Sequence, residues 1–373
     1  MEVIVTTAHR FVRTPDGQMY STTGGRGYAF WERYLAVFGG VLVLARVGQA
    51  TGSVSRLQRA DGAQVSFIEI PAYRGPSGYV RQAERIARVV RSALSNKAAV
   101  ILRPGTPADS LACTLCRREG RPYGVEVVGD PHDVYAPGAV RNPLRPVFRC
   151  VFRRRQQELC AHACAAAYVT ECALQRRYPA PPDAFTTHYS DVELPPEAFA
   201  AQPRTARASD APATIVNVGT MAQMYKAQDI LIEAVARCTA QGASLRLVLV
   251  GDGRHRAELE TQAAKRGLAS RVRFAGQVPA GAAVRAELDC ADLFVMPSRT
   301  EGLPRAMIEA MARGLPCIGS TVGGIPELLP AEDMVPPNDA DALAAKMMEV
   351  LRNPARMAVM SERNWAKAHE YGE

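Results

Sequence analysis

The chain has 373 residues, of which 47% are apolar and 22% charged, and its formal net charge at pH 7 is +8. This length is enough for two hydrophobic cores, and the composition excludes a disordered, collagen-like or fibrous protein. The most apolar run covers only residues 35–45, about half of the ~20 residues that a membrane-spanning helix needs, so we expect no membrane span.

The amino-terminal residues lack the basic segment and the long apolar core of a secretory signal. Nine cysteines in a chain of this size are not needed as disulfide staples. Both features predict a cytoplasmic protein. Cys113 and Cys116 form a Cys-x-x-Cys pair, but no second pair follows at the spacing of a zinc site, so we expect neither a metal nor a redox centre there.

The positive charge lies in the first half. Residues 1–195 hold 25 Lys and Arg against 16 Asp and Glu, whereas residues 196–373 hold 20 against 21. The densest basic stretch, Arg141 to Arg155, has arginines about four residues apart with apolar residues between them, which predicts one basic amphipathic helix. We expect this helix to meet anionic lipid headgroups or a phosphate-bearing acceptor, most plausibly at a membrane surface. The alternatives are a helix with a solvated edge and a nucleic-acid site, and the second is disfavoured because no aromatic set or reading motif accompanies the arginines.

Short apolar runs alternate with segments of helical period, which predicts an α/β fold with parallel sheets covered by helices. The expected strands are residues 3–5, 41–44, 65–70, 98–102, 125–128, 166–170, 214–218, 245–250, 272–274, 293–296 and 317–318, with a helix at 78–94. A linker-like composition at residues 191–212 separates a predicted N-terminal domain, residues 1–195, from a C-terminal domain, residues 196–373. Parallel sheets bind ligands beyond the carboxyl ends of their strands, so we expect a ligand between the two domains.

Two segments of the second half suit a phosphate. Gly219 follows a strand, and Lys226 comes just before a helix, where a lysine can pair with a diphosphate beside free backbone N–H groups. The next strand ends in Gly251-Asp252-Gly253, a turn in which missing side chains allow a close approach of backbone. Taken alone, this second glycine turn is better read as structural.

Two carboxylates flank the start of the helix predicted after residue 303. Glu301 lies in the loop after a buried strand, Pro304 suits the first turn, and Glu309 lies about 7–8 Å further along the helix axis. This spacing places one carboxylate at a sugar and the other at the ribose of one nucleotide sugar. Either residue alone would be a capping residue or a solvated helix residue.

These segments carry a resemblance. Residues 298–304, 309–316 and 323–327, together with Lys226 and the runs 250–253 and 274–276, resemble the signature of family-4 retaining glycosyltransferases of the GT-B fold, of the kind that builds bacterial glycans. The resemblance is specific over residues 213–370. Over residues 1–190 it is weaker, and there it rests on Gly24 and Gly25 and on the runs 129–131 and 169–171.

The resemblance implies a role for each matching residue. Glu309 holds the nucleotide ribose, Glu301 lies at the reactive face of the donor sugar, and Lys226 binds the diphosphate. Either Asp130 or His132 contacts the sugar. The remaining donor contacts implied are Gly24, Gly25, Gly219, Thr220, Gly251, Gly253, Gly302, Leu303 and Arg305.

The sequence departs from the family at two places. Many members carry an arginine where this chain has Thr220, so Lys226 acts with backbone amides alone or with another cation such as Arg305. The chain also ends at Tyr371-Gly372-Glu373, where relatives usually continue into a helix returning to the first domain, which suggests a shortened C-terminus.

The resemblance implies transfer of a sugar from a nucleoside diphosphate to a hydroxyl, such as that of a lipid-linked acceptor, with retention of configuration and without a metal or other cofactor. We expect the enzyme in the cytoplasm, peripheral at the inner face of the membrane. A catalytically weak binding or scaffold protein and a nucleotide-sugar epimerase stay open as alternatives. A nicotinamide-dependent oxidoreductase is disfavoured, since residues 24–27 lack the G-x-G-x-x-G spacing.

Overall fold

The computed structural model describes residues 1–22, 26–55, 57–73, 75–139, 142–190, 192, 194–205 and 211–372. Contacts within the chain divide it into two compact units. Unit 1 consists of Met1–Val128, Arg154–Tyr168 and Gln175–His188, and unit 2 of Gly129–Arg153, Val169–Leu174 and Tyr189–Glu373. Unit 2 thus includes two segments from the first half of the sequence, and a simple division after residue 195 stays a prediction.

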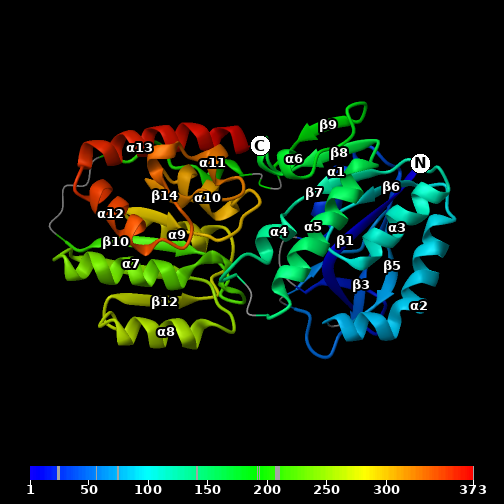
Figure 1. Cartoon of the computed structure of the whole chain (residues 1–373), viewed down its shortest axis with the longest axis horizontal. Helices are drawn as coiled ribbons and strands as arrows, with labels where there is room; N and C mark the ends of the chain where they lie inside the picture. Colours follow the sequence, from blue (N-terminus) through cyan, green and yellow to red (C-terminus); the bar gives the residue numbers. More distant parts are fainter. Residues whose placement is uncertain are drawn as a thin grey trace. The chain divides into compact units, whose positions relative to one another are not determined.

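Unit 1 is built on a mostly parallel sheet (Figure 1). Its strands are β1 (Glu2–Arg13), β2 (Met19–Ser21), β3 (Gly40–Gln49), β4 (Gln58–Arg59), β5 (Val65–Pro71), β6 (Ala99–Leu102), β7 (Gly124–Val127), β8 (Ala165–Tyr168) and β9 (Phe185–His188). The parallel strands lie in the order β5-β3-β1-β6-β7-β8-β9, while β2 pairs antiparallel with β1 and β4 with β2. Residues of the parallel strands are largely apolar, as expected for a sheet buried on both faces.

Strand β1 changes partners along its length. Its residues Val3 to Val5 pair with β6, and Phe11 to Arg13 pair with β2. Between these two ladders the pairing of β1 with β3 shifts register, from Thr6 to Arg10. This irregularity is a β-bulge, which bends a strand and redirects its side chains.

Helices cover unit 1. On one face, α1 (Ala29–Leu35) packs Trp31 and Tyr34 against the inner strands. Next, α2 (Gly75–Leu94) packs on β5, and α3 (Pro107–Arg118) packs on α2 and β6. The remaining helices before the second sheet are α4 (Pro131–Val134), α5 (Arg145–Ala161) and α6 (Ala173–Arg177).

Unit 2 holds a six-stranded parallel sheet in the order β12-β11-β10-β13-β14-β15. Its strands are β10 (Ala213–Val218), β11 (Leu245–Val250), β12 (Val272–Gly276), β13 (Leu293–Met296), β14 (Cys317–Ser320) and β15 (Met334–Val335). Apolar clusters place α7 (Gln228–Ala240), α8 (Arg256–Lys265) and α12 (Ala340–Leu351) on one face, and α9 (Ala282–Asp289), α10 (Arg305–Ala312) and α11 (Ile325–Leu328) on the other (Figure 1). Helix α13 (Pro354–Ala368) packs on α10 and α12. Short 3₁₀ turns complete the unit: η1 (Pro196–Ala198), η2 (Met224–Lys226), η3 (Ala331–Asp333) and η4 (His369–Tyr371).

The expected α/β class with two Rossmann-like sheets is confirmed, and two local details differ. The basic helix α5 begins at Arg145 and ends at Ala161, rather than covering 141–155, and Arg141 lies outside the described residues. Asn142 explains the late start, because its side chain accepts a hydrogen bond from the backbone of Leu144 and Pro143 restricts the residue before it. The described part of the expected linker includes the buried residues Val192, Leu194 and Ala198. Within the described residues, no helix combines the length and the apolarity that a bilayer crossing requires.

Candidate donor site

A buried ion pair joins two of the predicted site residues. Lys226, in the turn η2 before α7, donates to both carboxylate oxygens of Glu301, with Nζ–O distances of 2.7 and 2.9 Å. Ser298 donates to Oε1 of the same carboxylate at 2.5 Å. Glu301 is 8% exposed, so its charge depends on these partners rather than on water.

The neighbouring Arg299 holds the loop of Glu301 against the turn of Lys226. Its guanidinium makes a two-pronged ion pair with Asp229, at 2.8 and 2.7 Å, and also donates to Met224 O and Asn338. The backbone N–H of Arg299 donates to Tyr225 O at 2.7 Å. Both the backbone and the side chain of Arg299 therefore tie the loop that carries Glu301 to the segment that carries Lys226. Such planar, bidentate contacts give direction as well as energy.

Two glycine turns bring the ends of β10 and β11 together. A Cβ at Gly219 would lie 3.0 Å from Cγ of Lys226, so this glycine makes room for the lysine. Gly251 has φ +132°, and a Cβ there would overlap the carbonyl oxygen of Gly219; a Cβ on Gly253 would overlap the backbone of Ala222. The backbone of the 219–222 turn and that of the 251–253 turn are thus in direct contact.

Glu309 lies apart from this pair, on the fifth residue of α10. It lines a cavity of about 200 Å³ together with Arg305, Arg285 and Gly281. Burial raises the pKa of Glu309 above its ordinary value, and the positive charges of Arg305 and Arg285 act against this shift. A partly desolvated carboxylate beside two guanidinium groups suits hydrogen bonds from the hydroxyls of a ribose. A cavity of this size holds part of a nucleotide rather than a whole one.

Thr220 supports the turn instead of offering a charge. Its hydroxyl donates to Asp252 O at 3.3 Å and accepts from Ala222 N at 3.1 Å. Arg305, named as a possible substitute cation, lies in the cavity of Glu309. The described contacts therefore leave Lys226 as the cation at the Gly219 turn that pairs with Glu301.

Gly302 and Leu303 continue the loop after Glu301. The carbonyl of Gly302 accepts from Gly324 N at 2.8 Å, and Leu303 packs on the apolar cluster under the sheet. Gly323 has φ +53°, and a Cβ there would overlap the carbonyl oxygen of Glu301. Gly323 and Gly324 thus support the Glu301 loop through their backbone.

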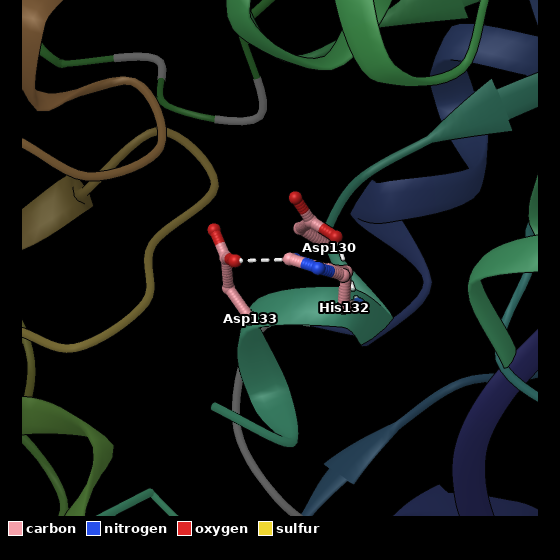
Figure 2. Close-up of side chains that lie close together, drawn as sticks. All are labelled: Asp130, His132 and Asp133. Carbon is pink, nitrogen blue, oxygen red and sulfur yellow. Dashed lines mark hydrogen bonds and ion pairs between the residues drawn. The ribbon is translucent and has the colours of Figure 1, made fainter. Parts of the chain in front are cut away.

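Asp130 and His132 open α4, and Figure 2 shows them beside Asp133. The buried Asp130 caps the helix by accepting from the backbone N–H of His132 at 2.9 Å. Nδ1 of His132 lies 2.9 Å from the carboxylate of Asp133, and Arg149 donates to His132 O at 2.9 Å. Ligand atoms of the three labelled residues lie within 4.8 Å of one another, but the guanidinium of Arg149, 3.2 Å from the same ring nitrogen, disfavours a metal cation there. The choice between Asp130 and His132 as a sugar contact stays open.

Other predicted contacts are placed as follows. Gly24 and Gly25 lie outside the described residues. Glu327, at the end of the signature, accepts from three successive backbone N–H groups, those of Glu171, Cys172 and Ala173, at 2.6 to 2.9 Å. It therefore anchors the segment that leads into α6.

Sequence reasoning missed four residues that the structure brings into the donor site. Ser298 and Arg299 stand inside the signature but received no role, and Asp229 and Arg285 lie on α7 and α9 without any local signal. A larger cavity of about 550 Å³ lies in unit 1, over small residues of β6, β7 and β8, and contains none of the predicted site residues.

Residues 212–353 match the family described as glycosyl transferases group 1. Among curated proteins, Protein CapJ of Staphylococcus aureus is 26% identical over 319 residues, which cover 84% of this chain and 78% of CapJ. The putative colanic acid biosynthesis glycosyltransferase WcaL of Salmonella typhimurium is 35% identical over 158 residues, which cover 40% of this chain and only 38% of WcaL. The solved structure of Anabaena Alr3699/HepE in complex with UDP-glucose is similar over 100% of this chain and 95% of that one, with a TM-score of 0.65 and 17% identity.

Two parallel sheets of this kind, the second ending in a lysine–glutamate pair on glycine turns, define a nucleotide-sugar-dependent glycosyltransferase of the GT-B fold. More narrowly, residues 212–353 match the group 1 glycosyltransferases, and this part of the chain resembles family 4, a family of retaining enzymes.

The contact between the glycine turns generates a stability prediction. We expect Gly251→Ala to lower the free energy of unfolding by about 2–4 kcal/mol, because strained backbone and overpacking add together. Gly242→Ala is the matched control: Gly242 also has positive φ, +86°, but no atom lies within 4 Å of its Cβ position, so we expect about 1 kcal/mol. Urea denaturation measures both. Equal losses in the two variants would contradict the close contact.

Proposed function

We propose that this enzyme transfers a sugar, with retention of configuration, from a nucleoside-diphosphate sugar to a hydroxyl of a lipid-linked or glycan acceptor during polysaccharide assembly. The observation that carries the proposal is the buried Lys226–Glu301 pair at the Gly219 turn. The names of the relatives support it, since WcaL is described for colanic acid biosynthesis and HepE was solved with UDP-glucose.

The proposed chemistry breaks the bond between the anomeric carbon and the diphosphate oxygen, which leaves with the electron pair, and forms a bond from that carbon to the acceptor oxygen on the same face. The proton of the acceptor hydroxyl passes to the departing diphosphate. Charge builds up on the departing diphosphate and on the sugar ring. Lys226 would stabilise the diphosphate, and the carboxylate of Glu301 would support the cationic sugar. In the ligand-free structure the two residues neutralise each other, so a bound diphosphate would compete with Glu301 for Lys226.

Two other functions fit the same fold. A catalytically weak binding protein is favoured by Thr220, whose hydroxyl supports a turn where relatives place a second cation. Release of nucleoside diphosphate from UDP-glucose, or from a panel of other nucleotide sugars, separates an enzyme from a binder. An epimerase would convert the donor sugar without acceptor, which analysis of the sugar product detects.

The first kinetic prediction concerns Lys226. We expect Lys226→Gln to lower the turnover of donor hydrolysis by about 100-fold or more, and donor affinity by only about tenfold, because the charge on the diphosphate grows in the transition state. Steady-state kinetics and calorimetric titration with the donor measure the two effects.

The change also leaves Glu301 buried without its cation, which costs about 3 kcal/mol or more of stability. The double variant Lys226→Gln/Glu301→Gln is the control, since it removes both charges. It should recover stability without recovering turnover. A full loss of donor affinity with normal turnover of the bound donor would make Lys226 a simple phosphate anchor.

The two carboxylates should respond differently. We expect Glu309→Gln to weaken nucleoside diphosphate and nucleotide sugar alike, by about tenfold or more, because each loses a hydrogen bond to a charged acceptor. Glu301→Gln should chiefly impair transfer. Calorimetry with the nucleoside diphosphate decides between them, and the reverse pattern would contradict the assignment.

A specific surface supports a peripheral membrane location at the cytoplasmic face. Leu144, Val147 and Val151 are 56%, 57% and 37% exposed, and their spacing along α5 places them on one stripe. Arg153 and Arg154 are exposed beside this stripe, whereas Phe148 and Phe152 pack on the ring of Tyr135. Exposed apolar residues flanked by arginines match the interface of an anionic bilayer.

Vesicle binding tests this surface. We expect co-sedimentation with vesicles containing phosphatidylglycerol but not with neutral phosphatidylcholine vesicles, and release by salt, since each basic residue contributes about 1 kcal/mol near an anionic surface and screening removes it. Changing Arg153, Arg154 and Arg155 to Ser should abolish binding. Changing Arg352 and Arg356 of unit 2 to Ser is the matched control. Binding that ignores lipid charge, or that survives the triple change, would contradict the proposal.

A further inference from the structure

Unit 1 contains a half-buried guanidinium with no carboxylate partner. Arg46 lies on β3, and its Nη2 donates to Ala8 O at 2.6 Å, inside the bulge of β1. Nε of Arg46 is buried without a hydrogen-bond partner among the described residues. None of the described carboxylates lies within ion-pair distance of Arg46, and the same holds for Arg10. Burial lowers the pKa of Arg46, which shows that its charge is poorly solvated.

The contrast with Arg103 shows that this is not the usual arrangement in unit 1. Arg103 follows β6 and is 2% exposed, but its guanidinium pairs with Glu126 and donates to the hydroxyl of Tyr34. A buried charge is normally compensated in this way. The fold therefore pairs one buried arginine fully and leaves the other without an anion.

Arg46 lies among residues that follow the ends of neighbouring strands. Tyr73, which follows β5, stacks its ring 5.2 Å from the guanidinium carbon. Gly105, which follows β6, lies so close to Ala8 that a Cβ there would be 2.6 Å from the Cβ of Ala8. Bulge and strand ends thus meet at the carboxyl edge of the parallel strands, where α/β sheets bind ligands.

The charge around Arg46 is positive. Arg10 is exposed at the end of the bulge, and its positive charge lowers the pKa of Arg46. The positive charges of Arg26 and Arg46 in turn lower the pKa of His9. Burial and these two arginines lower the pKa of His9 to about 4, so the imidazole is neutral at pH 7. Tyr73 and the buried Asp109 oppose this positive charge at Arg46, and Oδ2 of Asp109 caps α3 by accepting from Thr106 N and Oγ1 at 2.6 and 2.9 Å. The one carboxylate that acts on Arg46 is therefore already engaged.

We propose that Arg46 and Arg10, at the bulge of β1, bind an oxyanion of the sugar acceptor, either a phosphate or a carboxylate. The inference rests on the proposed glycosyl transfer and names the chemical class of its second substrate. Guanidinium groups bind both oxyanions through paired N–H donors. An anion here supplies the charge partner that the chain itself does not give to Arg46.

Binding to protein saturated with a nucleoside diphosphate tests the site, because saturation removes competition at Lys226. The probes are phenyl phosphate, glucuronate and, as the neutral control, glucose, and ligand-observed NMR gives the Kd. We expect one of the two anions to bind and glucose not to. Phosphate binding points to a phosphate-bearing lipid or sugar, and glucuronate binding to an acidic glycan.

Three variants make the test specific. Arg46→Gln should weaken the bound anion about tenfold or more. Arg10→Gln, at an exposed position, should weaken it in the same direction and keeps the test valid where Arg46→Gln fails to fold. Arg13→Gln is the matched control on the same strand, since Arg13 pairs with Glu69, and it should leave the Kd unchanged.

The outcomes separate this inference from the proposed function. Failure of both anions to bind, or wild-type affinity in Arg46→Gln and Arg10→Gln, overturns the oxyanion site. A protein that releases no nucleoside diphosphate from any nucleotide sugar contradicts the glycosyl transfer instead. The first result leaves donor turnover intact, so the two failures are distinguishable.

Discussion

The ion pair between Lys226 and Glu301 is the interaction on which the arrangement of the donor site depends. Both groups are largely removed from water, so each is the main charge partner of the other. Neighbouring residues hold the pair in place. Ser298 donates a hydrogen bond to one carboxylate oxygen of Glu301, and Arg299 joins the two segments through its ion pair with Asp229. Gly219 leaves space for the side chain of Lys226. A ligand that takes Lys226 from Glu301 must therefore offer comparable negative charge, which a diphosphate does.

Much of the fold was predictable because its sheets are parallel and buried. Strands such as 214–218 and 245–250 are mostly apolar runs followed by glycine, and the structure has them at β10 and β11. The strands β2, β4, β9 and β15 were not predicted, since they have two to four residues and lack a long apolar run. The start of α5 was predicted too early because periodicity continues through Pro143, whereas the backbone does not.

The donor site was predictable to the extent that its residues are close in sequence. Glu301 and Glu309 stand in one motif, and Lys226 could be added from its place before a helix. The partners Asp229 and Arg285 could not, because they reach the site only through the packing of α7 and α9. The bulge of β1 was equally hidden, since a change of strand partner follows from pairing between distant segments rather than from local pattern.

The contact between the 219–222 and 251–253 turns has a consequence for how such a chain can change over generations. Gly251 and Gly253 are each required by backbone atoms of the 219–222 turn, which cannot shrink as a side chain can. No second substitution in the opposite turn relieves an added methyl group at Gly251 or Gly253. The two turns are therefore constrained together, and an alanine at either glycine requires the backbone of both turns to move.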